Sequence, residues 1–184
     1  MADWNTAYNF MMDNEDGPRA CAQIPDAPEQ LDPVSGERIG AYAISGVNSA
    51  AWPAEFAAIA ALPQNQREPL VQQFYQNHVW NQWLAQLVSD DVCKRVFDFA
   101  VNAGGGKAVR CLQQAVNSLA APGVALLTVD GGWGPMTLKA TNAADPTALT
   151  LAFQTQRVAD YQAIAANNPN LAKYLPEWTA RAER

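Results

Sequence analysis

The sequence predicts a mainly α-helical protein with one small irregular or β-containing lobe near residues 18–49. Apolar residues recur at helical spacing through most of the chain, which is the main sequence signal for amphipathic helices. Alanine is abundant, whereas strand-like runs of Val, Ile and Thr are rare. With 184 residues, 49% of them hydrophobic, the chain can bury one good core. We therefore expect a single compact unit over residues 1–184.

The first predicted helix begins after Asp3, whose carboxylate can cap free amide groups. Gly17 and Pro18 are expected to end this helix, because neither residue continues a helix well. Its apolar face is predicted to contain Trp4, Ala7, Tyr8, Met11 and Met12. Residues 18–49 are rich in Pro, Asp, Gly and Ser, and so long an irregular connection usually carries function. Within it, residues 39–45 alternate weakly and predict a short strand pair.

The remainder of the chain is predicted to be helical. Asn48 or Ser49 is expected to cap the next helix, with Pro53 in its first turn, and Ser89 or Asp90 is expected to cap a later one. Helices are predicted over residues 49–62, 67–87, 89–104, 106–120, 147–169 and 171–184, with a turn-rich stretch over 129–141 that enters a further helix. The glycines at 104–106 predict a tight corner between two of these helices.

The net charge of −6 excludes binding to nucleic acid or to an anionic membrane through bulk electrostatics. The N-terminal residues have no basic segment followed by an apolar one, so we expect no Sec signal peptide. No run approaches the ~20 apolar residues of a membrane span, so we expect no stable membrane insertion. Cys21, Cys93 and Cys111 are predicted to be buried free thiols, with a Cys93–Cys111 pair as the alternative.

Two motifs favour a structural interpretation. The glycine-rich residues 103–108 resemble a phosphate loop, but they follow a predicted helix and Ala108 replaces the hydroxyl that would bind magnesium. His78 lies among aromatic residues, and no Ser or Cys has the sequence context of a nucleophile, so packing or a structural hydrogen bond is expected. Since His78 is the only histidine, we predict neither a metal site nor a cofactor.

Three carboxylates at the end of the first predicted helix are candidates for catalysis. Asp13, Glu15 and Asp16 crowd the last turn, where the helix dipole opposes negative charge. The simple interpretation is a solvated helix end. A glycosidase, however, needs one carboxyl group held protonated beside an apolar wall and a second carboxylate across the sugar. Glu15 fits the first role, and Asp32 or Glu37 in the irregular lobe fits the second.

Other side chains are candidates for binding a substrate. Trp133 lies in a glycine-rich loop, where a large ring is not needed to fill a helix face, and it could stack on a sugar or shape a cleft rim. Asp98 and Asn102 are four residues apart, so they point the same way from one helix and could bind sugar groups. The alternative for this pair is a polar network at the helix corner. Trp80 and Trp83, at helical spacing, are assigned to the core.

Several segments resemble glycoside hydrolase family 108, the lysozyme-like muramidases of phages and bacteria. The N-terminal signatures of that family correspond to Glu15-Asp16-Gly17, Asp32-Pro33 with Gly36, and Tyr42-Ala43-Ile44-Ser45. The downstream correspondence consists of FAAIAALP, FYQNHVWNQW, VFDFAVNAG with LQQAVN, and DGGWGPMTL. The sequence departs from the family where Asp16 replaces a glycine and Pro18 an aromatic residue. The threonine expected before Tyr42 is also unmatched, and Ser35 and Ser45 are possible substitutes.

The resemblance implies a lysozyme-like helical domain, with a catalytic part at residues 1–92 and a peptidoglycan-binding part at residues 93–184. It implies Glu15 as the catalytic acid, Asp32 and then Glu37 as the second carboxylate, and Tyr42 as a substrate contact. The expected activity is that of an N-acetylmuramidase acting on peptidoglycan glycan strands as a monomer. A phage endolysin, held in the host cytoplasm and released to the periplasm and cell wall, fits best. A non-catalytic peptidoglycan-binding protein and a chitinase-like glycosidase are the alternatives.

Overall fold

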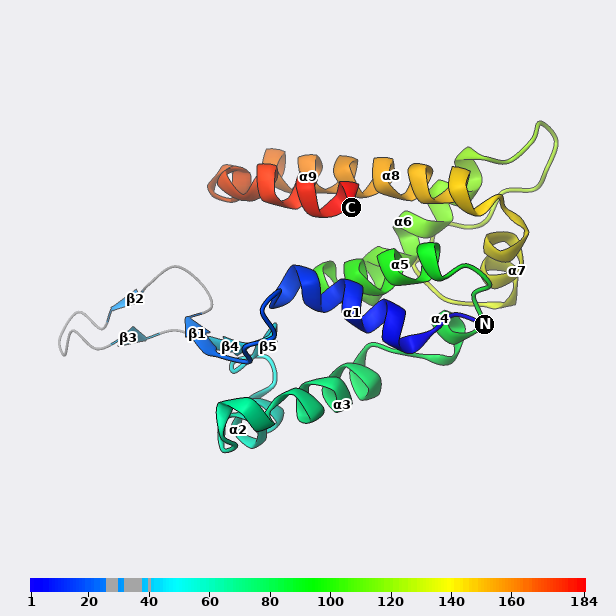
Figure 1. Ribbon diagram of the computed structural model, residues 1–184. Coiled ribbons are helices and arrows are strands. Elements are labelled where there is room, and N and C mark those ends of the chain that lie inside the picture. Colours follow the sequence, from blue (N-terminus) through cyan, green and yellow to red (C-terminus); the bar gives the residue numbers. More distant parts are fainter. Residues whose placement is uncertain (26–29, 32–37, 40) are drawn as a thin grey trace. The chain divides into compact units, whose positions relative to one another are not determined.

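The computed structural model describes residues 1–25, 30–31, 38–39 and 41–184 (Figure 1). It confirms a mainly α-helical fold with a small β lobe. The chain divides into two compact units, one formed by residues 12–78 and the other by residues 1–11 and 79–184. Among the described residues, no helix is both long and apolar enough to cross a membrane.

Helix α1 (Trp4–Glu15) contributes residues to both units. It begins as predicted, because Asp3 Oδ1 accepts a hydrogen bond of 2.8 Å from the Thr6 amide. Its apolar face is also confirmed by the buried side chains of Ala7, Tyr8, Met11 and Met12. The helix ends at Glu15, immediately before Asp16 and Gly17.

The β lobe lies in the unit of residues 12–78. Strand β4 (Tyr42–Ile44) is central in a three-stranded antiparallel sheet and pairs with β1 (Gln23–Pro25) and β5 (Val47–Asn48). The turn between β4 and β5 aligns Ile44 with Val47. A separate antiparallel pair is formed by β2 (Gln30–Leu31) and β3 (Arg38–Ile39). Residues 39–45 were predicted to form a strand pair with each other, but the strands they contribute to, β3 and β4, lie in different sheets. The β4 strand instead pairs with β5 beyond this range, through a turn at Ser45 and Gly46.

The helices of this unit follow the sheet. They are α2 (Pro53–Ala60), the short 3₁₀ helix η1 (Gln64–Gln66) and α3 (Glu68–His78). Pro53 occupies the first turn of α2 as predicted, but neither Asn48 nor Ser49 caps this helix. Asn48 Oδ1 instead accepts the amides of Ala50 and Ala51 in the preceding turn, so α2 begins four residues later than expected.

One predicted helix is two in the structure. Residues 67–87 were expected to form a continuous helix, but α3 ends at His78 and α4 (Gln82–Ala85) starts anew. The physical reason is Asn81, whose side-chain oxygen accepts hydrogen bonds from the amides of Trp83 and Leu84 and thereby caps α4. Trp80, in the break, packs its half-buried ring against the rings of Trp4 and Phe97.

The larger unit is built around α5 (Asp90–Ala103) and α6 (Gly105–Ser118). Ser89 caps α5 as predicted, and the two helices meet at Gly104, whose φ of +90° favours glycine. The glycine cluster is therefore a helix corner, as the sequence indicated. Cys93 and Cys111 are buried free thiols on these two helices, and burial raises the pKa of Cys93 to about 12.

The C-terminal elements pack on this pair. The chain continues through α7 (Pro135–Ala143), α8 (Pro146–Asn167), the 3₁₀ helix η2 (Pro169–Tyr174) and α9 (Leu175–Glu183). Figure 1 shows α9 lying alongside α8, and α8 also contacts both α5 and α6. Phe99 and Phe153 meet edge to face in the core of this layer.

Candidate functional site

The carboxyl group of Glu15 lies at a close approach between three chain segments. A Cβ atom at Gly46 would lie 2.9 Å from Glu15 Oε2 and would overlap the hydroxyl of Tyr75. The side chain of Glu15, at the end of α1, is therefore packed against the turn between β4 and β5, beside an aromatic residue of α3. Glu15 is half-buried, so its carboxyl group is neither a freely solvated helix end nor a closed core residue.

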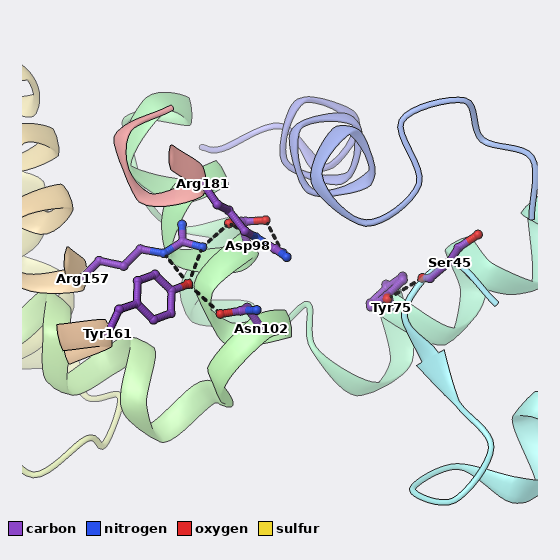
Figure 2. A network of polar contacts seen from close by, with 7 residues as sticks. All are labelled: Ser45, Tyr75, Asp98, Asn102, Arg157, Tyr161 and Arg181. Atoms are coloured by element: carbon purple, nitrogen blue, oxygen red, sulfur yellow. Dashed lines mark hydrogen bonds and ion pairs between the residues drawn. The ribbon is translucent and has the colours of Figure 1, made fainter. Parts of the chain in front are cut away.

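The turn at Ser45 and Gly46 holds an uncommon backbone conformation. Ser45 has a φ of +46° and Gly46 a φ of +83°, in the left-handed region that side chains with a Cβ usually avoid. Tyr75 stabilises this turn, because its hydroxyl donates a 2.8 Å hydrogen bond to the Ser45 carbonyl (Figure 2). Tyr75 is almost fully buried, so this bond is shielded from water. The wall beside Glu15 is thus a fixed structure.

Asp16 anchors the segment that follows Glu15. Its Oδ2 accepts hydrogen bonds from the hydroxyl of Ser45 (2.7 Å) and the amide of Cys21 (2.8 Å), and its Oδ1 accepts from the amide of Ala20. A carboxylate with three donors is a structural clamp. Asp16 therefore ties the end of α1 to the turn beside Glu15.

The third acid of the cluster has a different environment. Asp13 is exposed, and its carboxylate lies 3.7 Å from one guanidinium nitrogen of Arg19. The other terminal nitrogen of Arg19 lies 3.6 Å from the carboxylate of Glu68. Exposed ion pairs of this kind contribute little to stability. Of the three acids, Glu15 is consequently the one that combines partial burial with the close approach at Gly46.

His78 has a structural environment, as predicted. Its ring lies 4.4 Å from the ring of Trp52 and 4.8 Å from that of Phe74, measured between centroids. Its Nε2 lies 3.3 Å from a carboxylate oxygen of Glu55. Within the described parts of the chain, no three His, Cys, Asp or Glu side chains gather as metal ligands would.

Three predicted site residues belong to the β lobe. Asp32 and Glu37, the candidates for the second carboxylate, lie outside the described residues. Tyr42 is half-buried in β4, where it pairs with Pro25 of β1, and its amide donates to the hydroxyl of Ser49. Glu15 and Tyr42 both belong to a compact unit that does not include Asp98, Asn102 or Trp133.

Asp98 is the centre of a buried ionic network (Figure 2). Its side chain is fully buried, and its two oxygens lie 2.7 Å from Arg157 of α8 and 2.8 Å from Arg181 of α9. This is the helix network that the sequence left open as the alternative to sugar binding. Because both carboxylate oxygens are occupied, we assign Asp98 the role of joining α5, α8 and α9.

Asn102 lies at the edge of the same network. Arg157 donates to the hydroxyl oxygen of Tyr161, and this hydroxyl in turn donates to Asn102 Oδ1 over 2.6 Å. Burial raises the pKa of Tyr161, which keeps the hydroxyl protonated as a donor. Asn102 itself is exposed, so unlike Asp98 it is accessible from solvent.

Trp133 lines a hollow of about 360 Å³ in the larger unit. The loop that carries it is held by Gln113 of α6, whose amide donates to Asp130 Oδ1 over 2.8 Å and accepts from the Gly131 amide over 3.0 Å. Gly131 has a φ of +78°, and a Cβ there would lie 2.6 Å from the carbonyl oxygen of Gly106. The DGGWGP segment is therefore a tightly fitted loop with a half-buried tryptophan.

Residues 107–183 match the family described as "Predicted Peptidoglycan domain". This match associates the chain with peptidoglycan, the polymer of the bacterial cell wall. The match runs from the first turn of α6 to the end of α9 and includes the Trp133 loop, but it does not include the Glu15 segment.

The fold is also similar to a solved structure, "Structure of Brucella abortus SagA", with a TM-score of 0.56. The two sequences are 19% identical, and the alignment covers 97% of this chain and 92% of that chain. At this identity the similarity establishes a common fold. No curated protein matches the sequence.

Sequence reasoning missed the residues that surround Glu15. Tyr75 has no sequence signal beyond the apolar spacing of its helix, and Ser45 was named only as a possible substitute for a missing threonine. The glycine after Ile44-Ser45 was the available signal, since a glycine that closes a short strand often marks a turn with positive φ. No local sequence signal indicates that this turn packs against Glu15.

Proposed function

We propose that this protein is a peptidoglycan hydrolase, an N-acetylmuramidase that cleaves the β-1,4 bond between N-acetylmuramic acid and N-acetylglucosamine. The observation that carries the proposal is the placement of Glu15, half-buried against Gly46 and the hydroxyl of Tyr75. A catalytic carboxyl group has to be fixed in one geometry and partly shielded from water. The family match at residues 107–183 supports peptidoglycan as the substrate.

In the proposed reaction, Glu15 donates a proton to the glycosidic oxygen as the bond to the anomeric carbon breaks. A second carboxylate then stabilises the oxocarbenium-like centre or activates water, and Asp32 is the first candidate, followed by Glu37. A separation of about 5 Å between the two carboxyl groups corresponds to retention of configuration, and about 6.5–9.5 Å to inversion. Tyr42 and Asn102 are proposed as contacts to the glycan.

The first experiment replaces Glu15 by Gln, which keeps the shape of the side chain but removes the acidic proton. Because general acid catalysis contributes about 10²–10⁴-fold, we expect Glu15→Gln to release reducing ends from purified sacculi at least ~100-fold more slowly than the wild type. Asp13→Asn is the matched control, since Asp13 is an exposed acid on the same helix end, and it should retain near wild-type activity. Hydrolysis by Glu15→Gln at the wild-type rate would exclude Glu15 as the acid.

Asp32→Asn and Glu37→Gln, assayed in the same way, rank the two candidates for the second carboxylate. The product decides the substrate class, since muropeptide mass spectrometry identifies which sugar carries the new reducing end. A parallel assay on chitooligosaccharides distinguishes the muramidase from a chitinase-like glycosidase.

The second candidate function is a non-catalytic peptidoglycan-binding protein. One observation favours it: the family match covers residues 107–183 and does not include Glu15. Binding to sacculi by the wild-type protein without release of reducing ends would select this function. For either function, we propose residues 93–184 as the part that binds the wall, and for the hydrolase, residues 1–92 as the catalytic part.

The biological setting follows from the proposed substrate. We propose a phage endolysin that accumulates in the host cytoplasm as a monomer and reaches the periplasm and cell wall upon release. Lysis from within by the expressed protein should then require a membrane-permeabilising partner. Lysis by the protein alone would contradict this setting without affecting the enzymatic assignment.

A further inference from the structure

The hollow beside Trp133 has the composition of a sugar-binding site. Its volume is about 360 Å³, and it is lined by residues of α6, of the loop before α7 and of α7 itself. The rim contains strongly exposed apolar side chains, with Leu126 65% and Met136 71% exposed. Polar groups are contributed by Thr128 and Asp130, next to the half-buried ring of Trp133. A mostly apolar hollow that carries a few polar groups is typical of a ligand-binding site.

The base of the hollow is rigid. Gln113 is buried and makes hydrogen bonds to Asp130, to the carbonyl of Gly132 and to the hydroxyl of Thr137. A preformed hollow loses little conformational freedom when it binds a ligand. The hydrogen bonds of Gln113 thus hold the hollow in a shape that needs little rearrangement to bind a ligand.

Asp130 provides the charge of this hollow. Its Oδ1 accepts hydrogen bonds from Gln113 and from the amide of Gly132, and these bonds lower the pKa of the carboxyl group. Because both bonds end on Oδ1, Oδ2 is the atom that can accept a hydrogen bond from a ligand hydroxyl. A fixed carboxylate next to an aromatic ring suits a neutral sugar, which offers hydroxyl donors and an apolar C–H face.

We propose that this hollow binds the glycan strand of peptidoglycan, with Trp133 against the face of an N-acetylated sugar and Asp130 accepting from a hydroxyl group. All of its lining residues fall within residues 107–183, which match the peptidoglycan family. The ring of Trp133 and the acceptor oxygen of Asp130 match the apolar C–H face and the hydroxyl groups of a sugar, a combination that the peptide stems do not offer, so the glycan is the ligand. The site rests on the proposed substrate, peptidoglycan, and not on Glu15 as its catalyst.

The test measures co-sedimentation of the full chain with insoluble sacculi in the Glu15→Gln background, so that the wall is not digested. Trp133→Ala and Asp130→Asn should each weaken binding by about tenfold. Asp130→Asn retains Oδ1 as the acceptor for Gln113 and changes only the second oxygen, so the loop should keep its structure. Leu151→Ala is the matched control, because Leu151 is 61% exposed on α8 outside the hollow, and it should bind like its parent.

Should Trp133→Ala fail to fold, Leu126→Glu tests the same rim from an exposed position and should also weaken binding. Binding of Trp133→Ala, or of Leu126→Glu where the former is unfolded, with unchanged affinity would overturn the site. Glycan strands freed of peptide stems by an amidase should bind as tightly as whole sacculi, and loss of binding upon removal of the stems would overturn the assignment to glycan.

The two proposals fail in different assays. Hydrolysis is measured separately, on short soluble glycan fragments with Glu15 intact. If Glu15→Gln still hydrolyses glycan, the catalytic assignment is wrong, whereas the difference in binding between Trp133→Ala and Leu151→Ala, made in the same background, still decides the hollow. If Trp133→Ala and Asp130→Asn bind sacculi like their parent, the hollow is excluded while hydrolysis is unaffected.

Discussion

At the scale of single residues, the position of the Glu15 carboxylate depends on a glycine at residue 46. Gly46 combines a φ of +83° with a close approach of the Glu15 carboxylate and the Tyr75 hydroxyl. Either property alone would favour glycine, and together they leave no room for a side chain. The Glu15 carboxylate can therefore occupy its place only because residue 46 has no side chain.

Gly46→Ala should consequently impair hydrolysis as well as stability. A residue with a Cβ costs about 1–2 kcal/mol in the left-handed region. Here the new methyl group would also displace the Tyr75 hydroxyl and the Glu15 carboxylate, so hydrolysis of soluble glycan fragments should fall by at least about tenfold. Activity is measured on folded protein, and stability by urea denaturation.

Gly123→Ala is the matched control for Gly46→Ala. Gly123 has a φ of +85°, but a Cβ there would meet no atom within 4 Å. Gly123→Ala should therefore lose stability with little effect on turnover. Equal turnover in the two variants would show that the crowding at Gly46 does not position Glu15.

At the scale of elements, α5 joins the C-terminal helices α8 and α9 through a shared ion pair. Asp98, within this helix, binds Arg157 of α8 and Arg181 of α9, and Arg157 is also almost fully buried. Burying ions is costly, and removing one partner from a buried ion pair leaves the other charge uncompensated. Asp98 therefore ties α9 to α5, through an arginine 83 residues away in the sequence.

Asp98→Asn should lower the free energy of unfolding by about 3–5 kcal/mol, because it leaves two guanidinium groups without their anion. Asp91→Asn on the same helix is the comparison. Asp91 is 52% exposed and pairs with Lys94 and Arg95, so its loss should cost about 1 kcal/mol or less. Urea titrations followed by circular dichroism measure both values. A similar loss in both variants would contradict the central role of Asp98.

At the scale of the whole molecule, the three thiols report on the integrity of both compact units. Cys21 belongs to the smaller unit, and Cys93 and Cys111 belong to the larger one. Desolvation raises the pKa of all three thiols, and that of Cys93 reaches about 12. Since the thiolate is the reactive form, a native thiol at pH 8 is both inaccessible and protonated.

We expect a thiol reagent at pH 8 to leave the native protein unmodified and to label it as urea is added. Cys93 and Cys111 should become reactive at the same urea concentration, because α5 and α6 pack directly against each other. Brief labelling pulses followed by mass spectrometry of peptides give the transition for each cysteine. Rapid modification of Cys111 without denaturant would contradict the buried environment described for it.

Much of the fold could be predicted from the sequence because helices are encoded locally. Apolar spacing, the caps at Asp3 and Ser89 and the glycine corner at Gly104 all act within a few residues. The prediction was wrong where two local signals competed. A continuous apolar pattern over residues 67–87 indicated one helix, but Asn81 caps a new helix within it.

The candidate site was predictable only in part. The sequence by itself determined that acids crowd the end of α1 and that a tryptophan lies in a tight glycine loop, since both are properties of neighbouring residues. The tertiary structure decided what those groups contact. Asp16 reaches Ser45 across 29 residues, Gly46 lies against Glu15, and Asp98 is used by two arginines. Such pairings arise when segments distant in sequence pack together, and no local periodicity encodes which side chains then meet.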